Sequence, residues 1–182
     1  MNLTELQRFF ERPEAVHQGD PAAPEAHEAL LRALESGELR AAVRGEDGRW
    51  RALPWVKGAI LSAFRRAPLM VMEGPGFPCF DKTAFPPRRF APEDRVRLVP
   101  GGSAVRRGAC VSPGAVVMPP AYVNVGAFVG PDTMVDSHAL VGSCAQIGAR
   151  VHLSAGAQVG GVLEPAGALP VVVEDDAFVG GL

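Results

Sequence analysis

A six-residue repeat of aliphatic side chains runs through the second half of this 182-residue chain. Every sixth residue from Val99 to Val159 is Val, Ile or Leu, and the residue four positions after each of them is mostly small. This spacing matches neither an α-helix, with a period of about 3.6 residues, nor a lone amphipathic strand, with a period of about 2. It does match a parallel β-helix, in which each hexad forms one flat face and one corner of a prism.

The repeat also predicts which residues stack on one another. Three hexads make one coil of about 18 residues, and successive coils lie about 4.8 Å apart. Adding 18 to each aliphatic position gives interior columns, of which two consist of Val105, Val123, Val141 and Val159, and of Val117, Val135 and Leu153. Each buried aliphatic side chain contributes about 1.5–3 kcal/mol, so the columns form a continuous core. The small residues are expected near the corners, where there is little room.

The hexad phase is interrupted once, after Leu163. The segment 164–170 reads E-P-A-G-A-L-P and cannot continue the pattern, which resumes at Val173. We interpret Pro165 to Val172 as an excursion that leaves the prism at a corner. Surface loops that a rigid scaffold positions in this way often line a binding cleft.

The first half of the chain carries helix and turn signals instead of hexads. Helices are predicted from Leu3 to Glu11, from Pro24 to Ser36, and from Pro54 onward, with Pro at the start of the last two and Gly37 as a stop signal. Asp47-Gly48 predicts a hairpin that joins strands 39–44 and 49–53, and residues 69–72 are expected to be extended. We therefore divide the chain into a small α+β domain, residues 1–90, and a β-helix domain, residues 91–182.

Composition and charge exclude several classes of function. The formal net charge is −2, and residues 99–182 contain only three basic residues, so no basic surface for nucleic acid is predicted. No run of apolar residues is long enough to span a membrane or to resemble a signal peptide. The three cysteines lack the spacing of metal ligands, and we interpret them as reduced thiols of a cytosolic protein. Only two histidines, His138 and His152, lie among the hexads, whereas a catalytic zinc site needs three protein ligands.

The residues between the aliphatic positions are more specific than a generic hexad. The blocks Y-V-N-V-G-A-F-V at 122–129, T-M-V-D at 133–136 and V-G-S-C-A-Q-I-G at 141–148 resemble the tetrahydrodipicolinate N-succinyltransferase family. The block W-V-K-G-A-I-L-S-A-F-R at 55–65 is similar to the N-terminal region of the same family, so the resemblance covers essentially the whole chain. It implies a left-handed β-helix.

The resemblance also implies an activity and an assembly. Members of the family transfer a succinyl group from succinyl-CoA to the amine of ring-opened tetrahydrodipicolinate, in the diaminopimelate route of lysine biosynthesis. They are homotrimers with active sites between adjacent prisms. We expect this protein to be cytoplasmic and to hold no permanent cofactor or metal. Two other functions stay open for this chain: a tetrahydrodipicolinate N-acetyltransferase and a non-catalytic hexapeptide-repeat scaffold.

Two residues are candidates for the active site on the strength of this resemblance. Asp136 matches the family aspartate that binds or deprotonates the amine, and Arg97 matches an arginine that suits a substrate carboxylate. By position alone, Asp136 is a corner residue that caps its own backbone, and Arg97 is a solvated arginine beside a linker. Arg106 and Arg107 are weaker candidates for binding a carboxylate or the phosphates of CoA.

The sequence departs from the family pattern at its C-terminal end. Family members continue beyond the position matched by Leu182, and a glutamate proposed as the catalytic partner of the aspartate follows there. The β-helix is therefore expected to be incomplete at its C-terminus, with unpaired backbone groups on its last coil. We expect the 182-residue chain by itself to have little succinyltransferase activity.

Overall fold

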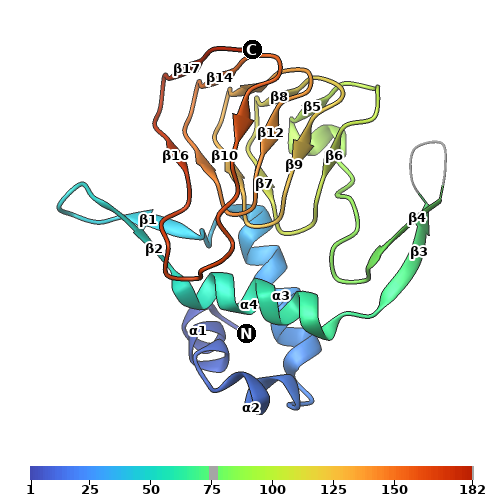
Figure 1. Cartoon of the computed structure of the whole chain (residues 1–182), viewed down its shortest axis with the longest axis vertical. Helices are drawn as coiled ribbons and strands as arrows, with labels where there is room; N and C mark the ends of the chain where they lie inside the picture. Colours follow the sequence, from blue (N-terminus) through green and yellow to red (C-terminus); the bar gives the residue numbers. More distant parts are fainter. Residues whose placement is uncertain (74–77, 182) are drawn as a thin grey trace.

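The chain folds into a helical N-terminal unit followed by a stack of triangular coils (Figure 1). This computed structural model describes residues 1–73 and 78–181, so Leu182, the last residue of the expected β-helix domain, lies outside the described residues. The predicted fold class, a left-handed parallel β-helix preceded by a small α+β unit, is confirmed. None of the helices in the described residues is both long and apolar enough to cross a membrane.

In the described residues, the N-terminal unit contains four helices and two antiparallel pairs of strands. They are α1 (Leu3–Phe10), α2 (Glu14–Gln18), α3 (Ala23–Ser36), β1 (Ala42–Arg44), β2 (Trp50–Ala52), α4 (Pro54–Arg66), β3 (Leu69–Glu73) and β4 (Pro78–Lys82). The predicted helices and the hairpin around Asp47-Gly48 are confirmed, although strands β1 and β2 are shorter than expected. Helix α2 and strand β4 were not predicted, because five-residue elements carry too little periodicity to be recognised.

Local signals explain where these helices begin and end. Asn2 and Glu5 form a capping box at the start of α1, each side chain accepting the other's backbone N–H at 2.9 Å. Pro54 occupies the first turn of α4, where its missing N–H costs nothing. Helix α3 ends at Gly37, whose φ of 77° lies in the left-handed region that favours glycine.

The second half forms three parallel sheets, one on each face of the prism. A short 3₁₀-helix, Pro92–Asp94, precedes them. The strands are β5 (Arg97–Leu98), β6 (Ala104–Val105), β7 (Cys110–Val111), β8 (Val116–Val117), β9 (Tyr122–Val123), β10 (Phe128–Val129), β11 (Met134–Val135), β12 (Leu140–Val141), β13 (Gln146–Ile147), β14 (His152–Leu153), β15 (Gln158–Val159), β16 (Val172–Val173) and β17 (Phe178–Val179). The three faces are ordered β5-β8-β11-β14-β17, β6-β9-β12-β15 and β7-β10-β13-β16.

The predicted interior columns are confirmed by the strand register. Val123 pairs with both Val105 and Val141, and Val135 pairs with both Val117 and Leu153. The small residues of each hexad are buried as well. Thr133, for example, is 1% exposed, and its hydroxyl donates to the Gly148 carbonyl at 2.8 Å. A polar side chain at that position is therefore satisfied inside the corner.

The first coil differs from the predicted repeat by one residue. Leu98, and not Val99, pairs with Val117 in the interior column. Val105 therefore follows the interior residue Leu98 by seven positions instead of six. The corner between Leu98 and Val105 contains Gly101 and Gly102, both with positive φ. The extra residue is absorbed there because glycine tolerates this backbone conformation.

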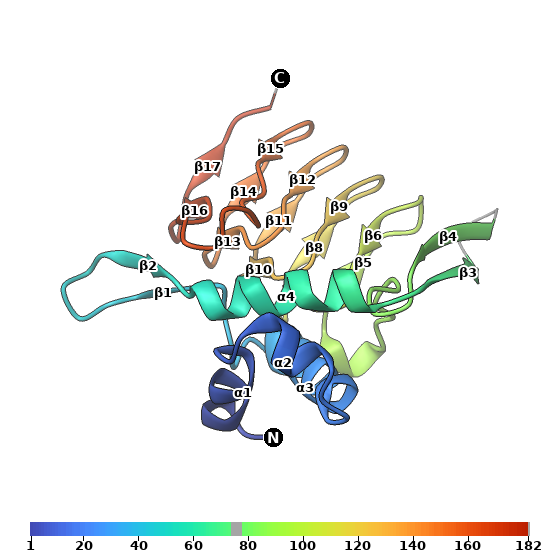
Figure 2. The same ribbon diagram turned by 60° about the horizontal axis from the view of Figure 1, so that its bottom comes forward.

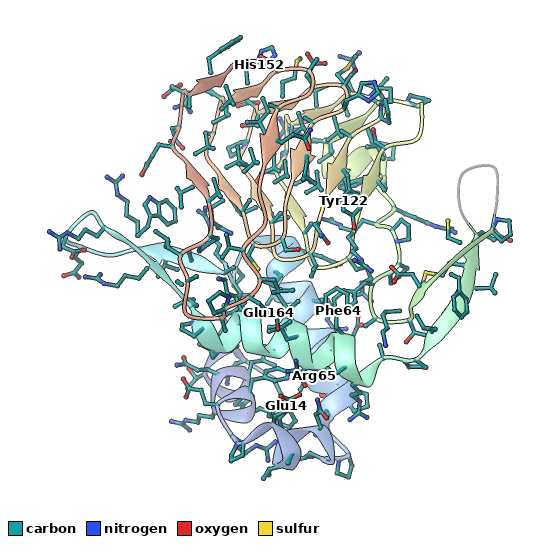
Figure 3. All side chains as sticks on the ribbon, in the orientation of Figure 1. Glu14, Phe64, Arg65, Tyr122, His152 and Glu164 are labelled. Atoms are coloured by element: carbon teal, nitrogen blue, oxygen red, sulfur yellow. The ribbon has the colours of Figure 1, made fainter. Side chains whose placement is uncertain are left out.

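The predicted excursion is present and rests on helix α4. Gln146 pairs with Val172, 26 positions later instead of 18, so eight additional residues leave the prism between β15 and β16. The prediction extended the excursion to Val172, whereas Val172 already belongs to β16. The ammonium of Lys57, a fully buried residue on α4, donates to the carbonyl of Ala168 in the excursion. Figure 3 shows Glu164 of the excursion close above α4.

Helices α3 and α4 cover one corner of the prism (Figures 1 and 2). Val125 and Cys144, from two successive coils, belong to the same apolar cluster as these helices. Gly126 follows Val125, and a Cβ there would come within 3.0 Å of the side chains of Cys144 and Ile60. Glycine is therefore required where the coils approach α4.

The N-terminal unit also contains a buried histidine that makes its stability depend on pH. His27 is 6% exposed, and burial, assisted by Arg66, lowers its pKa from 6.5 to about 4. The imidazole is therefore neutral in the folded protein, whereas the unfolded chain binds a proton below pH 6.5. Stability should fall as the pH decreases from 6.5 toward 4, by about 2 kcal/mol at pH 4.5 from this residue.

Urea unfolding at pH 7.5, 6.5, 5.5 and 4.5 checks this expectation in wild type and in His27→Phe. The phenylalanine keeps an aromatic ring beside Phe10 but cannot take up a proton. We expect the variant to lose part of the decline in unfolding free energy toward acid pH. An equal decline in both proteins would contradict the assignment to His27.

Candidate functional site

The Asp136 carboxylate lies at the corner between β11 and β12. One oxygen, Oδ1, accepts a hydrogen bond from the backbone N–H of Ser137 at 2.7 Å. The other oxygen, Oδ2, faces the Nε2 atom of His152 at 3.8 Å. The Asp136 side chain remains 29% exposed, so a ligand can reach it. Asp136 thus caps the backbone of its own corner, as predicted, and still presents an accessible carboxylate oxygen.

His152 belongs to the next coil and approaches Asp136 from the side. It is the first residue of β14 and pairs with Met134 of β11, two positions before Asp136. Its ring centroid lies 5.0 Å from that of Phe178, which is the corresponding residue of β17 and is 71% exposed. Figure 3 shows His152 on the side of the prism remote from the helices.

Arg97 lies on the same face of the prism as His152. It is exposed and pairs with Val116, which pairs in turn with Met134, so it is two coils away from the level of Asp136. Two coil spacings amount to roughly 10 Å. No hydrogen bond or ion pair of the Arg97 side chain is found within residues 1–73 and 78–181. Its guanidinium is accordingly available to a ligand, but it does not contact Asp136.

The weaker candidates, Arg106 and Arg107, have structural partners. Arg107 bonds Glu28 through both terminal nitrogens, at 2.8 and 2.9 Å, and Glu35 through Nε at 3.1 Å. These hydrogen bonds raise the pKa of Arg107 and join a corner of the prism to α3. Arg106 pairs with Asp81 of β4 and lies over the Phe64 and Phe85 rings. Neither guanidinium is free to bind a substrate carboxylate.

A shallow groove lies around the corner from Asp136, on the β6-β9-β12-β15 face. Its volume is about 360 Å³, and its floor includes Ala104, Tyr122 and Leu140 from successive strands. Gln158 closes one end, where its amide donates to the carbonyls of His138 and Gly156 at 2.9 and 3.0 Å. The groove and the Asp136 carboxylate therefore share one corner of the prism.

The described part of the chain contains neither a cluster of three metal ligands nor, at the two buried cysteines, a thiolate. No group of three potential metal ligands is found among those residues. Burial raises the pKa of Cys144 to about 12 and also raises that of Cys110, so both thiols stay protonated near neutral pH. The chemistry accessible to the site is therefore that of a carboxylate, an imidazole and a guanidinium.

The pairing of His152 with Asp136 was missed by the sequence reasoning, which considered His152 only as a metal ligand. The coil length contains a signal for it. Met134 lies 18 residues, or one coil, before His152, and Asp136 follows Met134 by two residues. Only the observed register shows that the side chain of His152 reaches across to the corner.

Comparison with known proteins relates this chain to one enzyme family. Residues 4–65 match a family described as tetrahydrodipicolinate N-succinyltransferase N-terminal. The chain is 50% identical over 164 residues to a protein of Paramagnetospirillum magneticum, 52% identical over 164 residues to one of Maricaulis maris, and 47% identical over 182 residues to one of Sinorhizobium medicae. Each of these relatives is named 2,3,4,5-tetrahydropyridine-2,6-dicarboxylate N-succinyltransferase.

The similarity covers most of this chain but less of its relatives. The matches extend over 86% of the chain for the first two relatives and over 96% for the third. The chain spans 57%, 58% and 63% of the respective relatives' own lengths.

Proposed function

Because this chain belongs to the tetrahydrodipicolinate N-succinyltransferase family, we propose that the whole protein transfers a succinyl group from succinyl-CoA to an amine. The acceptor is tetrahydropyridine dicarboxylate after hydrolysis of its ring C=N bond, which yields an acyclic amino dicarboxylate. The observation that carries the proposal is the accessible Asp136 carboxylate, at a corner of the face that holds the Arg97 guanidinium, which has no partner among the described residues. An amino dicarboxylate presents groups complementary to both.

The proposed reaction assigns a proton acceptor to Asp136. An amine attacks a thioester carbonyl only as the free base, so the acceptor, which enters as an ammonium ion, must first lose a proton. The Asp136 carboxylate binds the ammonium group and accepts that proton. The new N–C bond forms as the C–S bond breaks, the second amine proton is released, and CoA leaves as a thiol. The reaction as a whole releases one proton.

Arg97 is proposed to bind a carboxylate of the acceptor. A guanidinium presents two parallel N–H groups that match a carboxylate. Because Arg97 lies on the face that ends at the Asp136 corner, a single extended acceptor can contact both side chains. This arrangement would hold the reactive amine at Asp136 and orient it for attack.

The assembly and cellular setting are parts of the same proposal. The partly exposed Asp136 carboxylate and the exposed Phe178 ring support a homotrimer with active sites between neighbouring prisms. Succinyl-CoA is a co-substrate and no permanent cofactor is required. We place the protein in the cytoplasm, in the diaminopimelate route to lysine.

Competition between acyl donors tests the proposed function. The whole protein, extended to the length of its relatives, is given the acceptor with equimolar succinyl-CoA and acetyl-CoA, and the two amide products are separated by mass spectrometry. We expect the succinyl product to predominate by at least about tenfold, since a donor carboxylate can pair with a cationic group. A preference for acetyl-CoA would indicate the N-acetyltransferase. No product from either donor, under conditions where a relative is active, would favour a scaffold.

A further inference from the structure

The Asp136 carboxylate is contacted at both of its oxygens, and by groups of different kinds. The Ser137 backbone N–H holds Oδ1 at 2.7 Å, whereas Oδ2 faces only a side chain, His152 Nε2 at 3.8 Å. The second distance is longer than a hydrogen bond but short enough for an electrostatic contact. Catalytic contacts are often long before a ligand binds and shorten in its complex.

The placement of His152 does not serve packing of the prism interior. The side chain is 40% exposed and points outward, while Leu153 beside it fills the core at 0% exposure. Its backbone is fixed by pairing with Met134 below and Phe178 above, and its ring rests against the Phe178 ring. Among the carboxylates that the structure describes, Asp136 alone lies within 4.0 Å of this imidazole.

We infer that His152 is a positioning residue that orients the Asp136 carboxylate toward the amine of the acceptor. The inference rests on the proposed function and adds a role for a histidine to it. An exposed carboxylate held at one oxygen can still rotate, and each rotamer that turns it away from the amine lowers the fraction of competent sites. An N–H group of the imidazole directed at Oδ2 restricts that rotation and leaves the outer lone pairs for the ammonium group.

Binding of two matched ligands tests this role without any need for turnover. The probes are 2-aminoheptanedioate and heptanedioate, which have the same two carboxylates and differ in the amine. Isothermal titration calorimetry at pH 7.5 gives the ratio of their dissociation constants, and this ratio isolates the contact with the amine. We expect wild type to prefer the amino compound by about tenfold, as for one charge-assisted hydrogen bond.

Three variants separate positioning from folding. His152→Leu should reduce the preference to about one third or less of the wild-type ratio, while affinity for heptanedioate stays within about twofold. His152→Gln, which keeps an N–H donor near the position of Nε2, should restore most of the ratio. His138→Asn is the matched control, because it changes the other β-helix histidine and asparagine tolerates the φ of 61° at that position.

The outcomes distinguish this inference from the proposed function. A wild-type ratio near one would contradict the role of the site in binding an amine, and the positioning role would fail with it. A wild-type preference that His152→Leu leaves unchanged would overturn the positioning role alone. Equal losses in His152→Leu and His152→Gln would also overturn it, since a donor at that position would then be irrelevant.

Discussion

Replacing Asp136 by asparagine is expected to lower kcat/KM for succinyl transfer by about 100- to 1000-fold, with little change in stability. Asparagine has the same shape, and its side-chain oxygen can still accept the Ser137 N–H that now bonds Oδ1. It cannot accept the amine proton and does not attract an ammonium ion. Both the binding and the deprotonation of the acceptor should therefore be impaired.

Turnover is measured as release of the free CoA thiol, in a version of the protein extended to the length of its relatives. The matched control is Asp132→Asn, the same substitution one corner earlier in the coil. Asp132 is exposed and has a φ of 57°, which asparagine adopts readily. We expect Asp132→Asn to stay within about twofold of wild type. Unchanged turnover in Asp136→Asn would argue against a catalytic role for this aspartate.

The second large effect concerns the stability of the prism. Leu153→Ala should lower the free energy of unfolding by about 3 kcal/mol, because it removes buried methyl groups and leaves a cavity in an interior column. Leu153 is fully buried and pairs with Val135 below and Val179 above. Neighbouring coils cannot close the gap, since their spacing is set by the hydrogen bonds between parallel strands.

The control for this prediction is Leu140→Ala, the same substitution at a residue that faces outward from strand β12. Leu140 is half-buried and lies on the outer surface, next to the interior Val141. Urea unfolding followed by circular dichroism should show a loss of about 1 kcal/mol or less for Leu140→Ala. Similar losses for the two variants would contradict the assignment of alternate residues to interior and surface.

The hexad pattern predicted the prism well because each coil repeats the same short sequence pattern. An aliphatic residue every six positions specifies both the strand and the face that it buries, as the pairing of Val123 with Val105 and Val141 shows. The prediction that Val99 is the interior residue was wrong, and Leu98 takes that position, because the glycines at the next corner accommodate an extra residue without shifting the following strand. Short elements such as α2 and β4 were missed because five residues carry too little periodicity to be recognised, and β4 also depends on its pairing with β3.

The sequence by itself determined the β-helix, its interior columns and the likeness to one enzyme family that singles out Asp136 and Arg97. The tertiary structure decided which groups surround them. It paired Arg107 with Glu28 and Glu35 from the N-terminal unit, and it placed His152 from the following coil beside the Asp136 carboxylate. Such contacts join residues that are distant in sequence, or lie on different coils, and they depend on the stacking register and on the docking of helices against the prism. Residue spacing along the chain specifies which side chains face outward, but only the assembled coils determine which of them meet.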